Sequence, residues 1–219
     1  MSKKRREARK KISNRLRTKK IIKKYGNWIA IHSDWTGKII PDCELTEYDA
    51  FAGGWADLWH MCIAELNPIV HRLRLENILY FVQIKEKYGE ICVYTNHYWP
   101  EIESVLDKYA TISAHVCEWC GRPDSPISKG GWVMCKCRIC DDKDQKKYGT
   151  FKTPYWERYD TDPEHCGIPN TYKYSQFVGD KKIDVTVDIS DTVREYRERW
   201  ERKVNKKQRR RLSMHGLCN

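Results

Sequence analysis

Apolar residues recur at helical spacing in two segments of the chain. In residues 55–66 they fall at i, i+3, i+4 and i+7, which predicts a helix with one wide buried face. Its apolar positions are Trp55, Leu58, Trp59, Cys62, Ile63 and Leu66. Because proline lacks the N–H that a helix interior needs, we expect Pro68 to interrupt this helix. A second turn or helix is then expected through residues 70–75.

Another helix is predicted to begin within residues 96–100 and to run to about residue 113. Pro100 suits the first turn of a helix, where the backbone N–H has no intrahelical acceptor. The positions expected to face inward are Ile102, Val105, Leu106, Tyr109 and Ile112. This helix leads the chain towards Cys117.

Residues 79–85 and 91–95 lie between these two helices and are rich in β-branched and aromatic side chains. They flank a short turn that contains glycine, which is typical of a β-hairpin. Tyr80, Val82 and Ile84 are expected to share one face, because alternate residues of a strand point to the same side.

The C-terminal third mixes several patterns. Residues 182–189 alternate between apolar and polar and predict a strand with one exposed face. A last helix is predicted over residues 193–212. Residues 148–178 are rich in aromatic side chains and proline, so we expect irregular structure there, and residues 141–144 are expected to form a polar loop.

These elements predict an α+β protein with a small body. The body combines the tryptophan-bearing helix, the β-hairpin and the second helix, which leads into a four-cysteine zinc ribbon. It is expected to span residues 26–193, with the ribbon at residues 115–141. Basic helical extensions are expected at residues 1–25 and 194–219.

Charge is segregated along the chain, whose net charge is +11. Residues 1–25 carry thirteen Lys and Arg against one acid, and residues 194–211 carry ten against three. Residues 26–193 are acidic, with 18 basic and 26 acidic side chains. Dense basic runs attract phosphate polymers by counterion release, so RNA or DNA is the expected partner of both ends. The predicted contact residues are Lys3, Lys4, Arg5, Arg6, Arg9, Lys10, Lys11, Arg15, Arg17, Lys206, Lys207, Arg209, Arg210 and Arg211.

No stretch of the sequence approaches the roughly 18 apolar residues of a membrane span. The N-terminus also lacks the apolar segment of a secretory signal. We therefore expect a cytoplasmic protein with no membrane partner. In that compartment the ten cysteines are not expected to form a disulfide framework.

Four cysteines have the spacing of a structural zinc site. Cys117 and Cys120 form a first C-x2-C knuckle, and Cys137 and Cys140 form a second one sixteen residues later. Two such turns facing each other can close a thiolate tetrahedron around one Zn²⁺, at about 2.3 Å per Zn–S bond, with no open position for catalysis. Gly121 is expected to supply the positive φ that often follows a knuckle.

Two neighbouring residues leave the ligand set open. Cys135 offers an alternative C-x-C pair with Cys137, although Cys140 would then be spare, so we expect Cys135 to be a packed thiol. His115 precedes Cys117 by two residues and is an alternative ligand, but we expect it to be solvated or hydrogen-bonded instead.

The order of these motifs resembles a family of small phage- and prophage-encoded zinc-ribbon proteins of unassigned function. That family combines a tryptophan-bearing helix, a hairpin of the type QVKEKFGG, a helix and a ribbon, and the resemblance covers about residues 53–141. The motifs that carry it here are Gly54-Trp55 with Leu58, Gln83 to Gly89, Ile91 to Tyr94, Cys117-x2-Cys120-Gly121, Gly130-Gly131-Trp132 and Cys137-x2-Cys140. Glu90, where the family tends to have glycine, and the extra Cys135 depart from the pattern. The resemblance implies a phage protein that acts in the bacterial cytoplasm.

We therefore expect a phage accessory protein that binds nucleic acid, mainly through phosphate contacts of its basic ends. A host ribonucleoprotein or transcription complex is one setting for such binding. Trp119 and Trp132 beside the zinc site could stack on unpaired bases. Packing against the ribbon is the expected role of both, however, and acidic side chains are as close to the site as basic ones.

Two other classes of function are alternatives to nucleic-acid binding. An acidic, aromatic-rich body would also suit a module that binds and modulates a host protein without nucleic acid. Metal knuckles also occur in HNH-type nucleases, but residues 121–136 hold no His or Asn, and no P-loop, GxSxG or HExxH motif occurs. We therefore expect no enzymatic activity.

Overall fold

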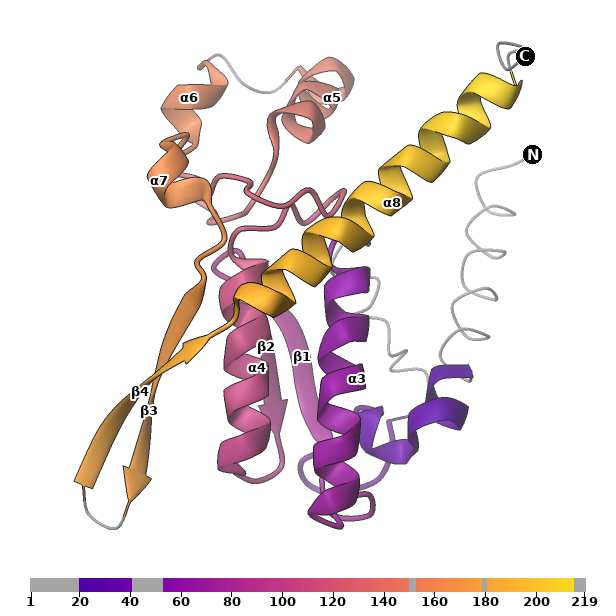
Figure 1. Cartoon of the computed structure of the whole chain (residues 1–219), viewed down its shortest axis with the longest axis vertical. Helices are drawn as coiled ribbons and strands as arrows, with labels where there is room; N and C mark the ends of the chain where they lie inside the picture. Colours follow the sequence, from indigo (N-terminus) through magenta and orange to yellow (C-terminus); the bar gives the residue numbers. More distant parts are fainter. Residues whose placement is uncertain (1–19, 41–52, 150–152, 179–180, 215–219) are drawn as a thin grey trace.

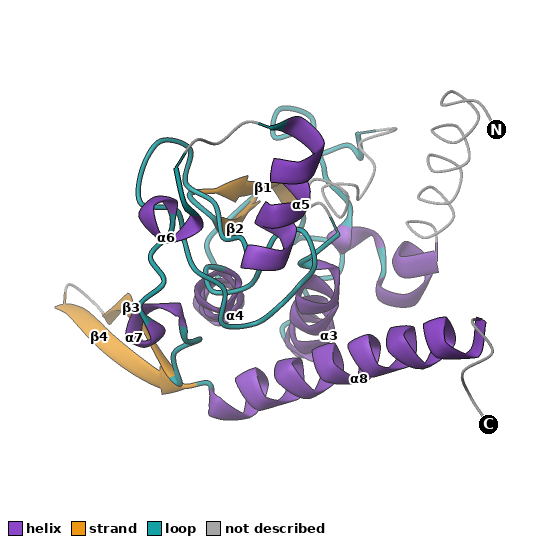
Figure 2. Cartoon of the chain, turned by 90° about the horizontal axis from the view of Figure 1, so that it is seen from above, coloured by secondary structure: helices purple, strands orange, loops and turns teal. Residues whose placement is uncertain are grey.

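The computed structural model describes residues 20–40, 53–149, 153–178 and 181–214. Its fold is α+β, as predicted, with two separate two-stranded sheets. Figure 2 shows the layers: the β1–β2 hairpin lies on one side of the α3–α4 pair, and α8 crosses the other side. The core lies between these layers, and residues of the helical segment 20–25 pack against it.

Helix α3 (Ala56–Arg72) runs unbroken through Pro68, so the predicted interruption is wrong. The carbonyl that loses its donor belongs to Ala64, and both Ala64 and Pro68 are exposed, so water can hydrate it. A proline in a helix interior costs about 3 kcal/mol. Leu66 and Val70 are fully buried on either side of Pro68, and each contributes about 1.5–3 kcal/mol, which offsets that cost.

Strands β1 (Phe81–Lys87) and β2 (Glu90–Thr95) form the predicted antiparallel hairpin. Its two-residue turn, Tyr88-Gly89, has φ of 55° and 80°, as a type I′ turn requires. A register shift between Phe81 and Gln83 brings Phe81 as well as Ile84 into the core. The predicted alternation is therefore wrong at the start of β1, because the shift adds one residue between the inward positions.

Helix α4 (Pro100–Ser113) matches its predicted bounds, and its five predicted inward residues are all buried. An ion pair between Lys108 and Glu65 ties it to α3. The Tyr109 hydroxyl donates to the same carboxylate at 3.1 Å. The polar link lies at the edge of the apolar contact between the two helices.

The second sheet pairs β3 (Thr171–Val178) with β4 (Lys181–Asp188). The prediction of a strand at 182–189 is confirmed, whereas the prediction of irregular structure for 171–178 is wrong. Tyr172 explains why this segment forms a regular strand. Its ring is buried, and its hydroxyl donates to the Ser104 carbonyl of α4 at 2.6 Å. Beyond this anchor the hairpin extends away from the body (Figure 1).

Helix α8 (Ser190–Met214) begins against the core and ends away from it (Figure 1). Val193 and Tyr196 are each 1% exposed, whereas the side chains of residues 201–208 are all exposed. The predicted boundary after residue 193 falls inside this helix.

Three short helices and one of eleven residues complete the described elements. They are η1 (Asn27–Ile29), α5 (Arg138–Tyr148), α6 (Tyr155–Arg158) and α7 (Pro163–Cys166). The polar loop predicted for residues 141–144 is wrong, since these residues lie within α5. This helix buries little besides Cys140 and Asp141, so side-chain ion pairs rather than an apolar face hold it in place.

Candidate metal centre and basic groove

Four cysteine sulfurs converge where α4, α5 and α8 meet. The Sγ atoms of Cys117, Cys120, Cys137 and Cys140 all lie within 4.8 Å of one another. Among the described residues this is the one such group of potential metal ligands. Cys137 is the N-cap of α5, so the second knuckle is the first turn of that helix.

Backbone hydrogen bonds shape the first knuckle. The Gly121 N–H donates to the Cys117 carbonyl at 2.8 Å, and the Cys117 N–H donates to the Arg122 carbonyl at 2.9 Å. Gly121 has φ of 76°, so the predicted need for glycine after this knuckle is confirmed. The closed turn points both thiols to one side.

The start of α3 presses directly on this turn. The Gly54 N–H donates to the Glu118 carbonyl at 2.9 Å, and the Trp55 indole N–H donates to the Val116 carbonyl at 2.7 Å. A Cβ on Gly54 would lie 2.1 Å from the Glu118 oxygen, so only glycine permits this approach. From the other side, the buried Tyr196 hydroxyl of α8 donates to the Gly121 carbonyl at 2.8 Å. Two helices therefore fix the first knuckle.

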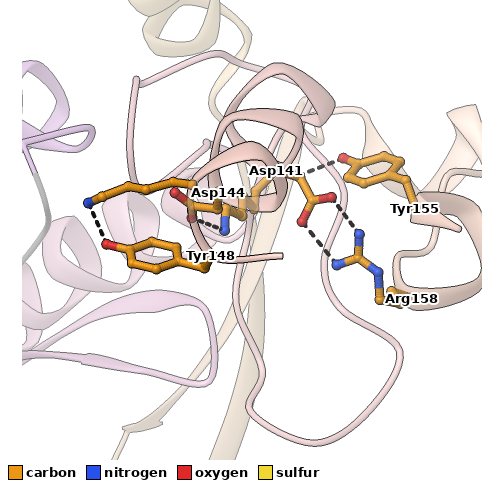
Figure 3. A network of polar contacts seen from close by, with 7 residues as sticks. Asp141, Asp144, Tyr148, Tyr155 and Arg158 are labelled. Carbon is orange, nitrogen blue, oxygen red and sulfur yellow. Dashed lines mark hydrogen bonds and ion pairs between the residues drawn. The ribbon is translucent and has the colours of Figure 1, made fainter. Parts of the chain in front are cut away.

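Ion pairs fix the second knuckle instead. Asp141, whose side chain is 1% exposed, accepts two hydrogen bonds from the Arg158 guanidinium, at 3.0 and 2.5 Å. Figure 3 shows this fork joining α5 to α6. Lys136 is buried and pairs with Asp144 at 2.5 Å, and its carbonyl accepts from the Tyr155 hydroxyl at 2.6 Å. A charge buried this deeply is tolerated only when it is paired.

The donor set fits a metal ion that prefers thiolates. Hydrogen bonds from Cys117 and Cys120 lower the pKa of Cys137, whereas burial raises the pKa of Cys140. Four thiolates this close cannot all be charged without a cation to offset them. The group contains only sulfur donors, which suit Zn²⁺ rather than Mg²⁺ or Ca²⁺. The structure therefore supports one structural metal site.

The two alternative ligands lie outside this group. Cys135 is fully buried and its thiol donates to the Ser125 carbonyl at 3.1 Å, as expected of a packed thiol. Burial lowers the pKa of His115, and backbone contacts with Cys166 and His165 partly oppose this. Neither side chain joins the four sulfurs.

The predicted nucleic-acid contacts are described only in part. Those from Lys3 to Arg17 lie outside the described residues. Lys206 and Lys207 are exposed on α8. Arg209, Arg210 and Arg211 belong to the same helix.

The structure adds a basic groove that the sequence did not indicate. A pocket of about 170 Å³ lies between the knuckles and α8, and four cations line it: Arg122, Lys143, Lys203 and Lys207. Trp200 lies beside them, with the Arg122 guanidinium 5.2 Å from its ring centroid. These residues come from three segments that are far apart in the sequence, so their proximity could not be predicted. The helical spacing of positions 200, 203 and 207 indicated only that these three residues share one face of α8.

The two tryptophans of the ribbon differ. Trp119 is half-covered, with the Lys136 ammonium 4.2 Å from its ring centroid, in line with the expected packing. Trp132 is 75% exposed, so the expectation that it packs against the ribbon is wrong. Glycines at positions 130 and 131 carry no side chain to cover it.

The fold and this site define a small α+β body with one apolar core and a separate four-cysteine centre. No family model, curated protein or solved structure matches the chain. The resemblance to the phage family therefore stays a prediction. None of the helices in the described part of the chain is both long and apolar enough to cross a membrane.

Proposed function

We propose that this protein is a phage accessory protein that binds nucleic acid through phosphate contacts, and that a structural zinc ion holds its ribbon together. Zn²⁺ would be held by Cys117, Cys120, Cys137 and Cys140, where it would cross-link the end of α4 to the start of α5. With four protein ligands such an ion has no open position, so its contribution is to folding rather than to chemistry.

The observation that carries the nucleic-acid proposal is the continuity of α8. Val193 and Tyr196 near its start are buried in the core, whereas the side chains of residues 201–208 are exposed and include four cations. None of the side chains of residues 201–208 is buried, so apart from the ion pair between Lys203 and Asp57 this part of the helix is open to solvent. A rigid, exposed row of cations is the form in which proteins present charge to a phosphate backbone.

The groove adds positive charge to that of the exposed cations of α8, even after the anions near the groove are counted. Zinc with four thiolates carries a net charge of −2, and Asp57 pairs with Lys203 at 2.7 Å. Four cations line the groove, so a small positive excess remains there. The larger excess is that of α8, whose residues 194–211 carry ten basic and three acidic side chains.

The test is the salt dependence of binding to a labelled oligonucleotide of random sequence, measured by fluorescence anisotropy with the full chain. We expect affinity to fall steeply between about 50 and 200 mM salt. The double variant Lys206→Gln with Lys207→Gln should flatten the slope of log K against log[salt] by about 1.5, because two phosphate contacts are lost.

A matched control removes the same charge elsewhere. Lys181 and Lys182 are exposed on β4, far from the tip of α8 (Figure 1). Their double substitution by glutamine should leave the slope unchanged if α8 makes the contacts. Equal effects of both pairs would show that only net charge matters and would refute the role of α8.

The alternative function, a module that binds a host protein, gives a different result. Capture of one host protein that persists at high salt and after nuclease treatment, with no oligonucleotide binding, would overturn the nucleic-acid proposal.

A further inference from the structure

The turn of the β1–β2 hairpin and the loop of the ribbon form a second pocket, separate from the cysteine site. It has a volume of about 330 Å³, and its lining includes Lys85, Lys87, Tyr88 and Trp132. Tyr88 and Trp132 are 69% and 75% exposed, so two large aromatic side chains are open to solvent beside the same pocket. Most of the surface of both side chains makes no contact within the described chain, which indicates a surface for a ligand.

Both aromatic residues are held on ordered turns. Tyr88 occupies the first position of the type I′ turn with φ of 55°, a conformation unusual for a residue with a side chain. The Glu86 carboxylate accepts from the Gly89 N–H at 2.8 Å and closes this turn. One carboxylate of the pocket is therefore already engaged with the backbone.

The loop that carries Trp132 is closed by Ser128. The Ser128 hydroxyl donates to the Trp132 carbonyl and accepts from the Met134 N–H, both at 3.0 Å. The Ser128 N–H in turn donates to the Met134 carbonyl at 3.0 Å. A Cβ on Gly89 would lie 3.4 Å from the Cys135 nitrogen, so the hairpin turn packs on this loop. The two aromatic residues are thus positioned relative to each other before any ligand arrives.

The lining of the pocket holds two lysines and one carboxylate, Glu86, and this excess of positive charge favours an anionic ligand. The Lys87 ammonium lies 5.4 Å from the centroid of the Tyr88 ring, and the Lys85 ammonium lies 5.0 Å from that of Tyr94. A phosphate bound by Lys87 would therefore bring its nucleotide to the Tyr88 ring. Aromatic faces next to lysines are the combination by which proteins hold unpaired bases and their backbone.

We propose that the Tyr88–Trp132 pocket binds an unpaired nucleobase, so that the protein prefers single-stranded nucleic acid to duplex. This inference rests on the proposed function and specifies its substrate. The volume is at the lower end of the range for small-ligand sites, roughly 300–1,000 Å³, and suits one or two bases. In a duplex the bases are stacked on each other and cannot enter.

The test compares a short labelled oligothymidylate with a duplex of the same length, using the full-length protein. Trp132→Ala should weaken binding of the single strand about tenfold or more, the loss typical of one stacked base, while duplex affinity stays within about twofold. Trp132→Phe should restore most of the affinity, because phenylalanine also offers a face for stacking. Trp35→Ala, which removes the 96% exposed Trp35, is the matched control and should bind both probes as the wild type does.

The outcomes separate this inference from the proposed function. Equal affinity of the wild type for both probes, with steep salt dependence, would overturn the stacking site and leave phosphate binding intact. Binding of neither probe would overturn both. A proline-rich peptide that binds the wild type but not Trp132→Ala, with single-strand affinity unchanged, would assign the pocket to protein recognition instead. Circular dichroism and zinc content should match the wild type for each variant, because Trp132 is exposed.

Discussion

The two knuckles of the ribbon supply equivalent ligands but are held by different forces. The first, Cys117 to Cys120, is fixed by backbone hydrogen bonds and by the close approach of Gly54. The second, Cys137 to Cys140, depends on ion pairs that join α5 to its neighbours. The first therefore belongs to the core of the body, whereas the second is an attachment to it.

This difference suggests that the two knuckles depend on the metal to different extents. The first knuckle can keep its shape without metal, because α3 and α8 hold it. The second has little apolar surface to bury, so it is expected to depend on a bound ion in addition to its ion pairs.

Removal of the metal should have the largest effect and should act mainly on the second knuckle. Apparent binding free energies of structural zinc in small peptides are about 10–16 kcal/mol. After chelation, we expect amide hydrogen exchange to rise strongly in residues 135–148 and only modestly in residues 115–122. Native mass spectrometry should show one zinc per chain before chelation. The variant Cys135→Ser should retain it, and an equal rise of exchange in both segments would contradict this difference.

Loss of the buried ion pair should come next. Arg158→Met leaves the Asp141 carboxylate buried without its partner and should reduce the free energy of unfolding by about 3–5 kcal/mol. Adding Asp141→Asn should restore much of this loss, because the uncompensated charge is then gone. Urea titrations followed by fluorescence measure both. If the double variant is less stable than Arg158→Met, the penalty does not come from the buried charge.

Gly54→Ala should weaken the first knuckle. Its new Cβ would lie 2.1 Å from a backbone oxygen, so the chain itself must move. We expect a loss of about 1–3 kcal/mol. Gly130→Ala is the control, because no atom lies within 4 Å of its Cβ, and it should change stability by less than about 0.5 kcal/mol. Similar stabilities of the two variants would rule out the close approach as a constraint.

The smallest effect is expected for Tyr196→Phe. The substitution removes the hydrogen bond to the Gly121 carbonyl and leaves that buried acceptor unpaired, at a cost of about 1 kcal/mol or slightly more. Tyr98→Phe, at a 64% exposed position, should have no measurable effect. A thermal unfolding scan compares the two. A neutral Tyr196→Phe would mean that this hydrogen bond does not help to hold α8 on the first knuckle.

The sequence predicted the parts of the fold that depend on local spacing. Apolar periodicity predicted α4 within its observed bounds, and the C-x2-C spacing predicted four cysteines that do come together. Both signals are short-range, because they describe one helical face or one turn.

The errors lie where distant contacts decide the structure. Pro68 is tolerated because the helix continues to bury Leu66 and Val70 around it. Helix α5 has no apolar stripe from which a helix could be predicted. Its position depends instead on ion pairs with Arg158 and Lys136. In β3, the alternation of Tyr172 and Tyr174 with polar residues was a usable strand signal, but the prolines before it favoured irregular structure.

The exposure of Trp132 and the basic groove could not be predicted either. A tryptophan between apolar residues is more often buried, and its exposure depends on the loop closed by Ser128. The groove unites Arg122 with residues of α8 about eighty positions away, and nothing in the local pattern links them.

The continuity of α8 also sets a length scale for binding. From Tyr196, anchored at the first knuckle, to Met214 the helix rises roughly 27 Å at about 1.5 Å per residue. At about 3.4 Å per base step, a strand that touched both the groove and the far end of the helix would cover roughly eight nucleotides. The length of the helix would thus set the number of nucleotides bound, and oligonucleotides shorter than this should contact only part of the helix.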